Sequence, residues 1–187
     1  AYCIIPSPTA ERNAVSSVTT LAEAIGAKPF FIGAEEHDSF VAAVSHLPFM
    51  MSVALMGCTA KSPNWNDIAP LASSGFEDLT RLASGDPVMH RDICTTNPEH
   101  IVAWMDAYIG ELYDLRNMLA GEDGPDPSEV QKVFVEAMEA RARWQAGIFT
   151  SLERLSGAEN ELPTFAESMG EMFVGRKGME AKKRFLG

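Results

Sequence analysis

The stretch EEHDSFVAAVSHLPFMMSVALMGC, residues 35–58, decides the fold, because its apolar side chains recur at helical spacing rather than alternating as in a strand. The predicted apolar stripe consists of Phe40, Val41, Val44, Leu47, Met51, Ala54, Leu55 and Cys58. Two residues interrupt it, since His46 adds an ionisable ring and Pro48 lacks the N–H that a helix needs. From Glu35 onward we predict a helical chain.

The residues before this stretch have a different pattern. YCII (2–5) and PFFI (29–32) predict two short strands, and the apolar spacing between them predicts a helix that ends at Gly26. Two strands of this length do not form a stable sheet by themselves. We therefore expect residues 1–33 to be the strand–helix–strand edge of a larger domain, and residues 34–187 to form a separate, all-helical domain.

Two long helices are predicted in the second half. The first begins at the capping residue Asn97, with Pro98 in its first position, and ends at Gly121. The second begins at the capping residue Asp126 and ends at Gly157. Their apolar seams are Ile101, Met105, Tyr108, Leu112, Leu115 and Leu119, and Val130, Phe134, Ala137, Trp144, Ile148, Leu152 and Leu155. Two seamed helices joined by a short acidic loop predict a hairpin and a subunit interface.

Composition and charge exclude several classes of function. The 15 basic and 26 acidic side chains give a net charge of −11, which repels nucleic-acid phosphates and anionic membrane surfaces. The cysteines Cys3, Cys58 and Cys94 form no CxxC pair, which favours reduced thiols. The apolar run Leu47–Cys58 is too short to span a bilayer, and the N-terminus lacks the pattern of an export signal. We expect a cytoplasmic protein with no nucleic-acid or membrane partner.

The sequence contains no convincing motif for a nucleotide or a metal ion. Its glycines form no GxGxxG, the usual device for holding a dinucleotide. GEMFVGRKG (170–178) only partly matches a phosphate loop, because Arg176 replaces the lysine and no Ser or Thr follows Lys177. The four histidines lack metal-ligand spacing, and on a straight helix His37 and His46 lie on opposite faces. We expect no cofactor-binding and no metal-binding residues in this segment.

Arg81 and His46 are the two candidates for a polar site. Arg81 lies between Leu79 and Leu82 and shortly after Asp78. Its guanidinium either pairs with an acidic side chain to support the fold, or offers its two parallel donors to a carboxylate ligand. A single histidine beside an apolar stripe, such as His46, is more often a hydrogen-bonded core residue than a catalyst. These residues alone leave both alternatives open.

A series of short motifs resembles the C-terminal half of the prephenate dehydrogenase family, which includes the arogenate enzymes. The motifs are IIPSPT (4–9), AIGA (24–27), EEHD (35–38), SHLP (45–48), GF (75–76), Asp78, TR (80–81), DPVM (86–89) and RDI (91–93). Each motif is short, but their order and spacing together are fairly specific.

The resemblance implies both a fold and an activity. Members of the family oxidatively decarboxylate prephenate or arogenate with NAD or NADP, in tyrosine biosynthesis. Their first domain is Rossmann-like and binds the nucleotide, and their second is an intertwined helical dimerisation domain. The chain is then mainly α: residues 1–33 are a β-α-β remnant of the Rossmann-like domain, and residues 34–187 dimerise and bind substrate. The family's catalytic histidine belongs to the nucleotide domain, so we expect this segment alone to be inactive and to contain no catalytic residue.

The resemblance also implies which residues bind the substrate, a small dicarboxylate or amino acid. The TR motif assigns Arg81 to a substrate carboxylate, with Thr80 beside it, and Asp78 is expected to hold or gate this arginine. His46 matches the family histidine before Leu-Pro. Pro48 is expected to disrupt the helix locally and to help aim neighbouring side chains into a cleft between the domains.

Three positions depart from the family pattern. The family usually continues SHLPH, where this chain has Phe49, and DPxMW, where this chain has His90. A basic residue often precedes the aspartate after GF, where this chain has Glu77. These changes remove a donor, add an aromatic ring and make the site more acidic, which predicts an altered substrate or lost activity. Phe49 and His90 are included among the expected substrate-binding residues.

Three hypotheses remain open. The first is the homodimer-forming and substrate-binding part of a prephenate or arogenate dehydrogenase. The second is a free-standing helical dimer that binds a small carboxylate at Arg81 without catalysis. The third makes Arg81 and His46 a buried polar network that sets the register of the helices and binds no ligand.

Overall fold

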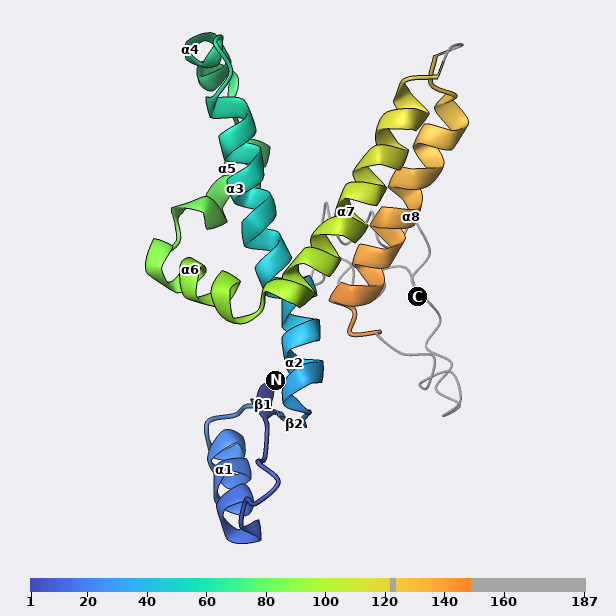
Figure 1. Cartoon of the computed structure of the whole chain (residues 1–187). Coiled ribbons are helices and arrows are strands. Elements are labelled where there is room, and N and C mark those ends of the chain that lie inside the picture. Colours follow the sequence, from blue (N-terminus) through green and yellow to red (C-terminus); the bar gives the residue numbers. More distant parts are fainter. Residues whose placement is uncertain (122–123, 149–187) are drawn as a thin grey trace, which may run out of the picture. The chain divides into compact units, whose positions relative to one another are not determined.

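The computed structural model describes residues 1–121 and 124–148 (Figure 1). The chain divides into two compact units, Ala1–Asp114 and Leu115–Gly187. Among the described residues, the strands are two short ones near the N-terminus, and every other regular element is a helix or a helical turn. The prediction of a mainly α chain is confirmed.

The first unit begins with a strand, a helix and a strand. These elements are β1 (Tyr2–Ile4), α1 (Arg12–Ala24) and β2 (Pro29–Phe31). The two strands are parallel, with Tyr2 opposite Pro29, and α1 lies against both of them (Figure 1). Gly26 ends the helix as predicted, with a φ of 78° in the left-handed region that favours glycine. The predicted pattern over residues 1–33 is confirmed, whereas its place in a larger domain stays a prediction.

A continuous helix with a π turn follows. Its elements are α2 (Ala34–Val41), η1 (Ala42–His46) and α3 (Leu47–Ala60) (Figure 1). In the π turn η1, the N–H of Leu47 donates to the carbonyl of Ala42, five residues earlier. Pro48 follows at once, and it interrupts the regular ladder because it has no N–H and its ring crowds the preceding turn. The local disruption expected at Pro48 is therefore confirmed, in the form of a π turn.

The π turn changes which face of α3 is buried. It holds one residue more than an α-helical turn, so the faces before and after it are offset by about 100°. The buried side chains of α3 are Phe49 and Ser52. On the predicted stripe, Phe40 is 50% exposed and Val44 is 78% exposed. The prediction of one continuous stripe over residues 35–58 is wrong, because it assumed an unbroken helical period.

Most of this helix is uncovered by the described part of the chain. The run Leu47–Cys58 alone is short, but the helix is continuous from Ala34 to Ala60, and by length and composition it is long and apolar enough to cross a membrane. Core helices of soluble proteins can be equally long and apolar. Only 17% of the most apolar stretch of this helix is buried by other parts of the described chain. The remaining apolar surface therefore requires a cover from elsewhere.

The next segment folds back along α3. Its elements are α4 (Trp65–Ile68), η2 (Ala69–Leu71), α5 (Ser74–Thr80), η3 (Arg81–Ser84) and α6 (Pro87–Thr96). Both α5 and the 3₁₀ turn η3 pack against α3. The N–H of Ala83 donates to Oγ of Ser52 at 3.0 Å, and Ser52 is 1% exposed. This shielded bond fastens η3 to α3.

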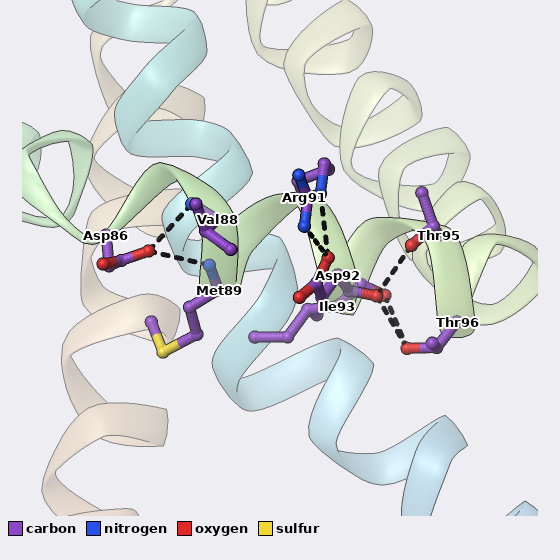
Figure 2. A network of polar contacts seen from close by, with 8 residues as sticks. All are labelled: Asp86, Val88, Met89, Arg91, Asp92, Ile93, Thr95 and Thr96. Atoms are coloured by element: carbon purple, nitrogen blue, oxygen red, sulfur yellow. Dashed lines mark hydrogen bonds and ion pairs between the residues drawn. The ribbon is translucent and has the colours of Figure 1, made fainter.

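Asp86 caps the start of α6. Its carboxylate accepts hydrogen bonds from the backbone N–H groups of Val88 and Met89, both at 2.8 Å (Figure 2). A helix start leaves such N–H groups unpaired, so the cap supplies bonds that would otherwise go to water. Farther along the same helix, Arg91 pairs with Asp92 on the surface (Figure 2).

The start of α7 (Pro98–Leu119) is fastened to α2. Pro98 takes the first helical position, as predicted. Asn97 precedes it as predicted, but its side chain does not bond to the N–H groups of α7. Its amide instead donates to the carbonyl of Asp38 at 2.8 Å, and the indole N–H of Trp104 donates to the carbonyl of Ser39 at 3.2 Å. The predicted capping role of the Asn97 side chain is wrong, because that side chain connects two helices.

The second unit contains α8 (Pro127–Gln145), which begins as predicted. The hydroxyl of Ser128 donates to the carboxylate of Asp126, as does the N–H of Ser128, both at 2.8 Å. These two bonds hold the pKa of Asp126 below its usual value. The predicted hairpin of α7 and α8 stays a prediction.

The predicted end of this helix at Gly157 is wrong. The helix stops at Gln145, because Gly147 has a φ of 75° and the N–H of Ile148 donates to the carbonyl of Arg143. Leu152, Leu155 and the stretch 170–178 lie outside the described residues.

Replacing Asp86 by alanine removes both cap bonds of α6. We expect Asp86→Ala to lower the free energy of unfolding by about 0.5–2 kcal/mol, whereas Asp86→Asn keeps an acceptor and most of the stability. Asp92→Ala is the matched control, because it removes the same charge from the same helix but only a surface ion pair. Urea unfolding followed by circular dichroism measures the difference. Equal losses for the two alanine variants would contradict the cap.

Candidate functional site

Arg81 lies where α5 ends and η3 begins, and its side chain is exposed. Among the described residues, its guanidinium takes part in none of the ion pairs, so the expected contact with Asp78 is not formed. The hydroxyl of Thr80 donates to the carbonyl of Phe76 at 2.7 Å, so its proton is used in a hydrogen bond within α5. The alternative in which Arg81 supports the fold by pairing with an acid is not favoured, and the guanidinium is accessible to a ligand.

Phe49 and His90, the two departures from the family motifs, are in direct contact. Their rings stack with centroids 4.3 Å apart and an angle of 7° between the planes. Phe49 is 5% exposed and His90 is half-buried, so the stack joins α3 to α6 in a largely dry environment. Neither ring had been expected to touch the other, because forty residues of sequence separate them.

Gly85 and Ser52 belong to the same cluster, and the sequence analysis missed both. A Cβ atom on Gly85 would lie 2.4 Å from Cε1 and 2.7 Å from Nε2 of His90. The imidazole therefore occupies the space that any larger residue at this position needs. Gly85 follows η3 directly, and Ser52 holds the same turn through Ala83. The GDP sequence at 85–87 marks a turn, but it gives no sign that a ring packs on the glycine.

His46 lies at the end of η1, half-buried against polar and aromatic neighbours. Its ring centroid is 5.9 Å from that of Phe49, and its Nδ1 is 3.4 Å from the amide nitrogen of Asn97. Burial lowers the pKa of His46 below its usual value, the charge of Asp38 raises it, and the charge of His37 lowers it again. The net lowering keeps His46 neutral at pH 7.

The expectation that the rings of His37 and His46 lie on opposite faces needs a correction for the π turn. That expectation assumed a straight helix, and the π turn lies between the two residues. Within the described residues, no group of three or more His, Cys, Asp and Glu side chains is arranged to hold a metal ion.

Asn97 is the centre of a polar network that the sequence analysis also missed. It is buried, and its amide nitrogen faces the carbonyl of Asp38 and the ring of His46. Its oxygen lies 2.8 Å from Nδ1 of His100, whose Nε2 lies 3.3 Å from the carboxylate of Glu35. The network connects α2, η1 and α7, which agrees with a structural role for His46. The position of Asn97 before Pro98 had suggested only a helix cap.

The candidate residues form two groups. His46, Phe49 and His90 make a row of neighbouring rings along η1, α3 and α6. Asp78, Thr80 and Arg81 lie on α5 and η3, and among the described residues they form no hydrogen bond or ion pair with these rings. The two groups are connected through the backbone of residues 81–85, where Ser52 bonds to Ala83 and the ring of His90 lies against Gly85.

The described residues do not fit the pyrophosphate of a dinucleotide. Residues 5–11, between β1 and α1, contain no glycine, and Glu11, the residue before α1, makes no side-chain cap bond. A dinucleotide site needs a glycine-rich turn whose N–H groups point at the phosphates. Residues of α1 and the segment before it, between Ala10 and Glu23, line a shallow hollow of about 520 Å³. None of the candidate site residues borders this hollow.

The sequence is similar to that of curated dehydrogenases. It is 31% identical over 123 residues to a prephenate dehydrogenase of Bacillus subtilis, covering 65% of this chain and 33% of the relative. It is 27% identical over 140 residues to a cyclohexadienyl dehydrogenase of Zymomonas mobilis, covering 74% of this chain and 47% of the relative. The chain thus spans about half or less of the length of these relatives.

The fold is similar to that of two solved dehydrogenases. Arogenate dehydrogenase of Synechocystis matches with a TM-score of 0.67 at 23% identity, over 76% of this chain and 51% of that one. Prephenate dehydrogenase of A. aeolicus, solved with hydroxyphenyl propionate and NAD+, matches with a TM-score of 0.63 at 24% identity, over 79% and 49%. At this identity the likeness establishes the fold.

The family model of the prephenate dehydrogenase dimerization domain matches residues 33–140, which is more than half of the chain. The match begins where the strand–helix–strand segment gives way to α2. It includes the π turn, the stacked rings and Arg81. The chain belongs to the prephenate dehydrogenase family and carries its dimerization domain.

Proposed function

We propose that this chain supplies the dimer interface and the substrate-carboxylate site of a prephenate or arogenate dehydrogenase, an NAD(P)-dependent oxidoreductase of tyrosine biosynthesis. The exposed guanidinium of Arg81 carries the proposal, because it forms none of the ion pairs of the described residues. The family match supports the reaction class. Hydride transfer and its catalytic group belong to the part of the protein that lies outside this segment.

The proposed substrate is a small dicarboxylate or amino acid whose carboxylate pairs with Arg81. Two parallel N–H···O bonds from a guanidinium hold a carboxylate in one plane, which orients the rest of the molecule. A charge-assisted bond of this kind contributes about 1.5–3 kcal/mol. Phe49 offers no donor where the family usually has a histidine, so recognition of the carboxylate depends more heavily on Arg81 in this chain.

The nucleotide is assigned to the rest of the full-length protein. We propose that residues 1–33 form the edge of its Rossmann-like domain, because β1 and β2 are a parallel pair too short to be stable alone. That domain would hold NAD or NADP, and the reduced cysteines and acidic charge agree with a cytoplasmic enzyme.

We further propose a homodimer. The buried apolar residues of the described chain are only Ile4, Ala22, Ile32, Ala42, Phe49 and Ile101. Large apolar side chains such as Val44, Leu79 and Phe134 are exposed instead. A protomer that leaves this much apolar surface uncovered needs a second copy to complete its core, as expected of an obligate interface.

Loss of Arg81 tests the carboxylate site. We expect Arg81→Ala in the full-length protein to raise the KM for prephenate or arogenate by about 10- to 150-fold, the equivalent of one charge-assisted bond. Arg81→Lys restores part of the affinity, because it keeps the charge but loses the paired donors. NAD(P)H formation measured at varied concentrations of each acid provides the KM values.

Arg91→Ala is the matched control, since Arg91 is an exposed arginine whose partner is Asp92 on the surface. An Arg81→Ala enzyme with unchanged KM for both acids would overturn the assignment of Arg81. A full-length protein that binds either acid at Arg81 but never reduces NAD(P) would favour the carboxylate-binding dimer without catalysis.

The neutral state of His46 predicts a pH dependence of stability. The pKa of His46 is lowered from 6.5 in the folded chain, so below about pH 6.5 the unfolded chain binds more protons than the folded one. Stability is unaffected by His46 above that pH and falls as the pH drops from about 6.5 through the folded pKa. We expect His46→Gln to flatten this decline in urea unfolding between about pH 6.5 and 5.5. A decline of the same slope in both proteins argues against a buried, neutral His46.

The dimer is tested by a charge on its exposed apolar helix. Val44 is 78% exposed in the protomer, and we expect Val44→Asp to shift the protein from dimer to monomer, because an unpaired carboxylate is costly in an apolar interface. Val44→Thr is the control, because it keeps the size of the side chain without a charge. Sedimentation equilibrium measures the mass, and a monomeric wild-type protein would contradict the proposed interface.

A further inference from the structure

The turn that carries Arg81 is short, and it packs against α3 and α5. Arg81 is the first residue of η3, its side chain is exposed, and η3 is a single 3₁₀ turn. Short 3₁₀ turns have poor hydrogen-bond geometry and do not hold a conformation by themselves. The direction of the Arg81 side chain must therefore be set by what holds the backbone of the turn from outside.

Beside the packing of η3 on α3, two specific contacts from other elements hold that backbone. Ser52 on α3 accepts the N–H of Ala83, two residues after Arg81. Gly85, which ends the turn, lies directly against the ring of His90, where a Cβ atom would approach to 2.4 Å. Both contacts involve backbone atoms within four residues of Arg81, so a shift at either point moves the base of the arginine side chain.

The ring of His90 is itself held in place. It stacks on Phe49 at 4.3 Å with nearly parallel planes, and Phe49 is buried in α3. A side-chain ring could otherwise rotate away from a new Cβ atom at Gly85 at little cost. Because the stack opposes this rotation, pressure at Gly85 is transmitted either to Phe49 or to the backbone of η3.

We propose that Phe49, His90, Gly85 and Ser52 form a clamp that positions Arg81 for the substrate carboxylate. The clamp rests on the proposed function of Arg81 and adds four positioning residues to it. Phe49 and His90 then act as one unit rather than as two separate departures from the family pattern. A change of either ring alone displaces the turn, whereas paired changes that restore a fitted stack preserve it.

Gly85→Ala tests the clamp without altering either ring. The new Cβ must displace the ring of His90 or the turn, so we expect faster hydrogen exchange of the amides at 82–85. We also expect the KM of the full-length enzyme for prephenate or arogenate to rise about tenfold, with a smaller change in kcat. Gly57→Ala is the matched control, because a Cβ on Gly57 in α3 meets nothing within 4 Å.

Two double variants separate positioning from general damage. In a His90→Ala background the space beside Gly85 is open, so adding Gly85→Ala should cause no further loss of exchange protection or affinity. In an Arg81→Ala background, Gly85→Ala should leave KM unchanged, because the clamp acts on affinity only through Arg81. A merely structural role of Gly85 predicts the same added loss in all three backgrounds.

The results distinguish failure of the clamp from failure of the proposed function. Normal exchange protection in Gly85→Ala, or an equal added rise in KM with and without Arg81, overturns the clamp. If the full-length wild-type protein turns over neither acid, the proposed function fails, and the exchange measurements in the Gly85→Ala and His90→Ala variants still decide whether the clamp exists.

Discussion

Pro48 has no N–H to give to the helix before it, and the chain accommodates this with a π turn over Ala42–His46. The turn inserts one residue into the helical period and so rotates α3 relative to α2. After this rotation Phe49 and Ser52 point into the protein, where they hold His90 and Ala83. The π turn thus brings together residues from α3, η3 and α6 that a regular helix would direct elsewhere.

On the other side of the π turn, the start of α7 is fixed by hydrogen bonds in addition to the buried Ile101. Asn97 bonds to the backbone of Asp38 and faces His46 and His100. A buried amide with several partners tolerates few alternative arrangements, because each arrangement leaves a polar atom without a bond. This network supports the interpretation of His46 as a residue that sets the register of the helices, whereas Arg81 remains accessible to a ligand.

Periodicity and helix-end signals predicted much of the fold. The strands near Tyr2 and Pro29, the stop at Gly26, and the starts of α7 at Pro98 and of α8 after Asp126 all rest on local backbone chemistry, which the sequence displays directly. A disruption at Pro48 was predicted, but the inserted residue of the π turn was not, because the apolar spacing is helical on either side of it. The stack of Phe49 on His90 and the burial of Asn97 were also unpredictable, since both depend on contacts between distant helices.

Of the candidate site, the accessibility of Arg81 agrees with a ligand-binding role, but its expected partner Asp78 does not touch it among the described residues. The family motifs identified Phe49 and His90 as unusual without showing that they are unusual together. A pair of substitutions in contact has a physical explanation, because a ring on one side of a stack restricts what fits on the other. Such coupling appears only when the two positions are placed in space.

Removing one residue from the π turn tests the central claim most directly. Deleting Ala43 should restore a regular helix and rotate Phe49 and Ser52 away from η3. Amide hydrogen exchange in the full-length protein is the measurement, with α7 as the internal reference. The account predicts that the Ala83 amide loses its protection while amides within α7 keep theirs. Retained protection at Ala83 would show that the turn is held without the rotation, and would contradict the account.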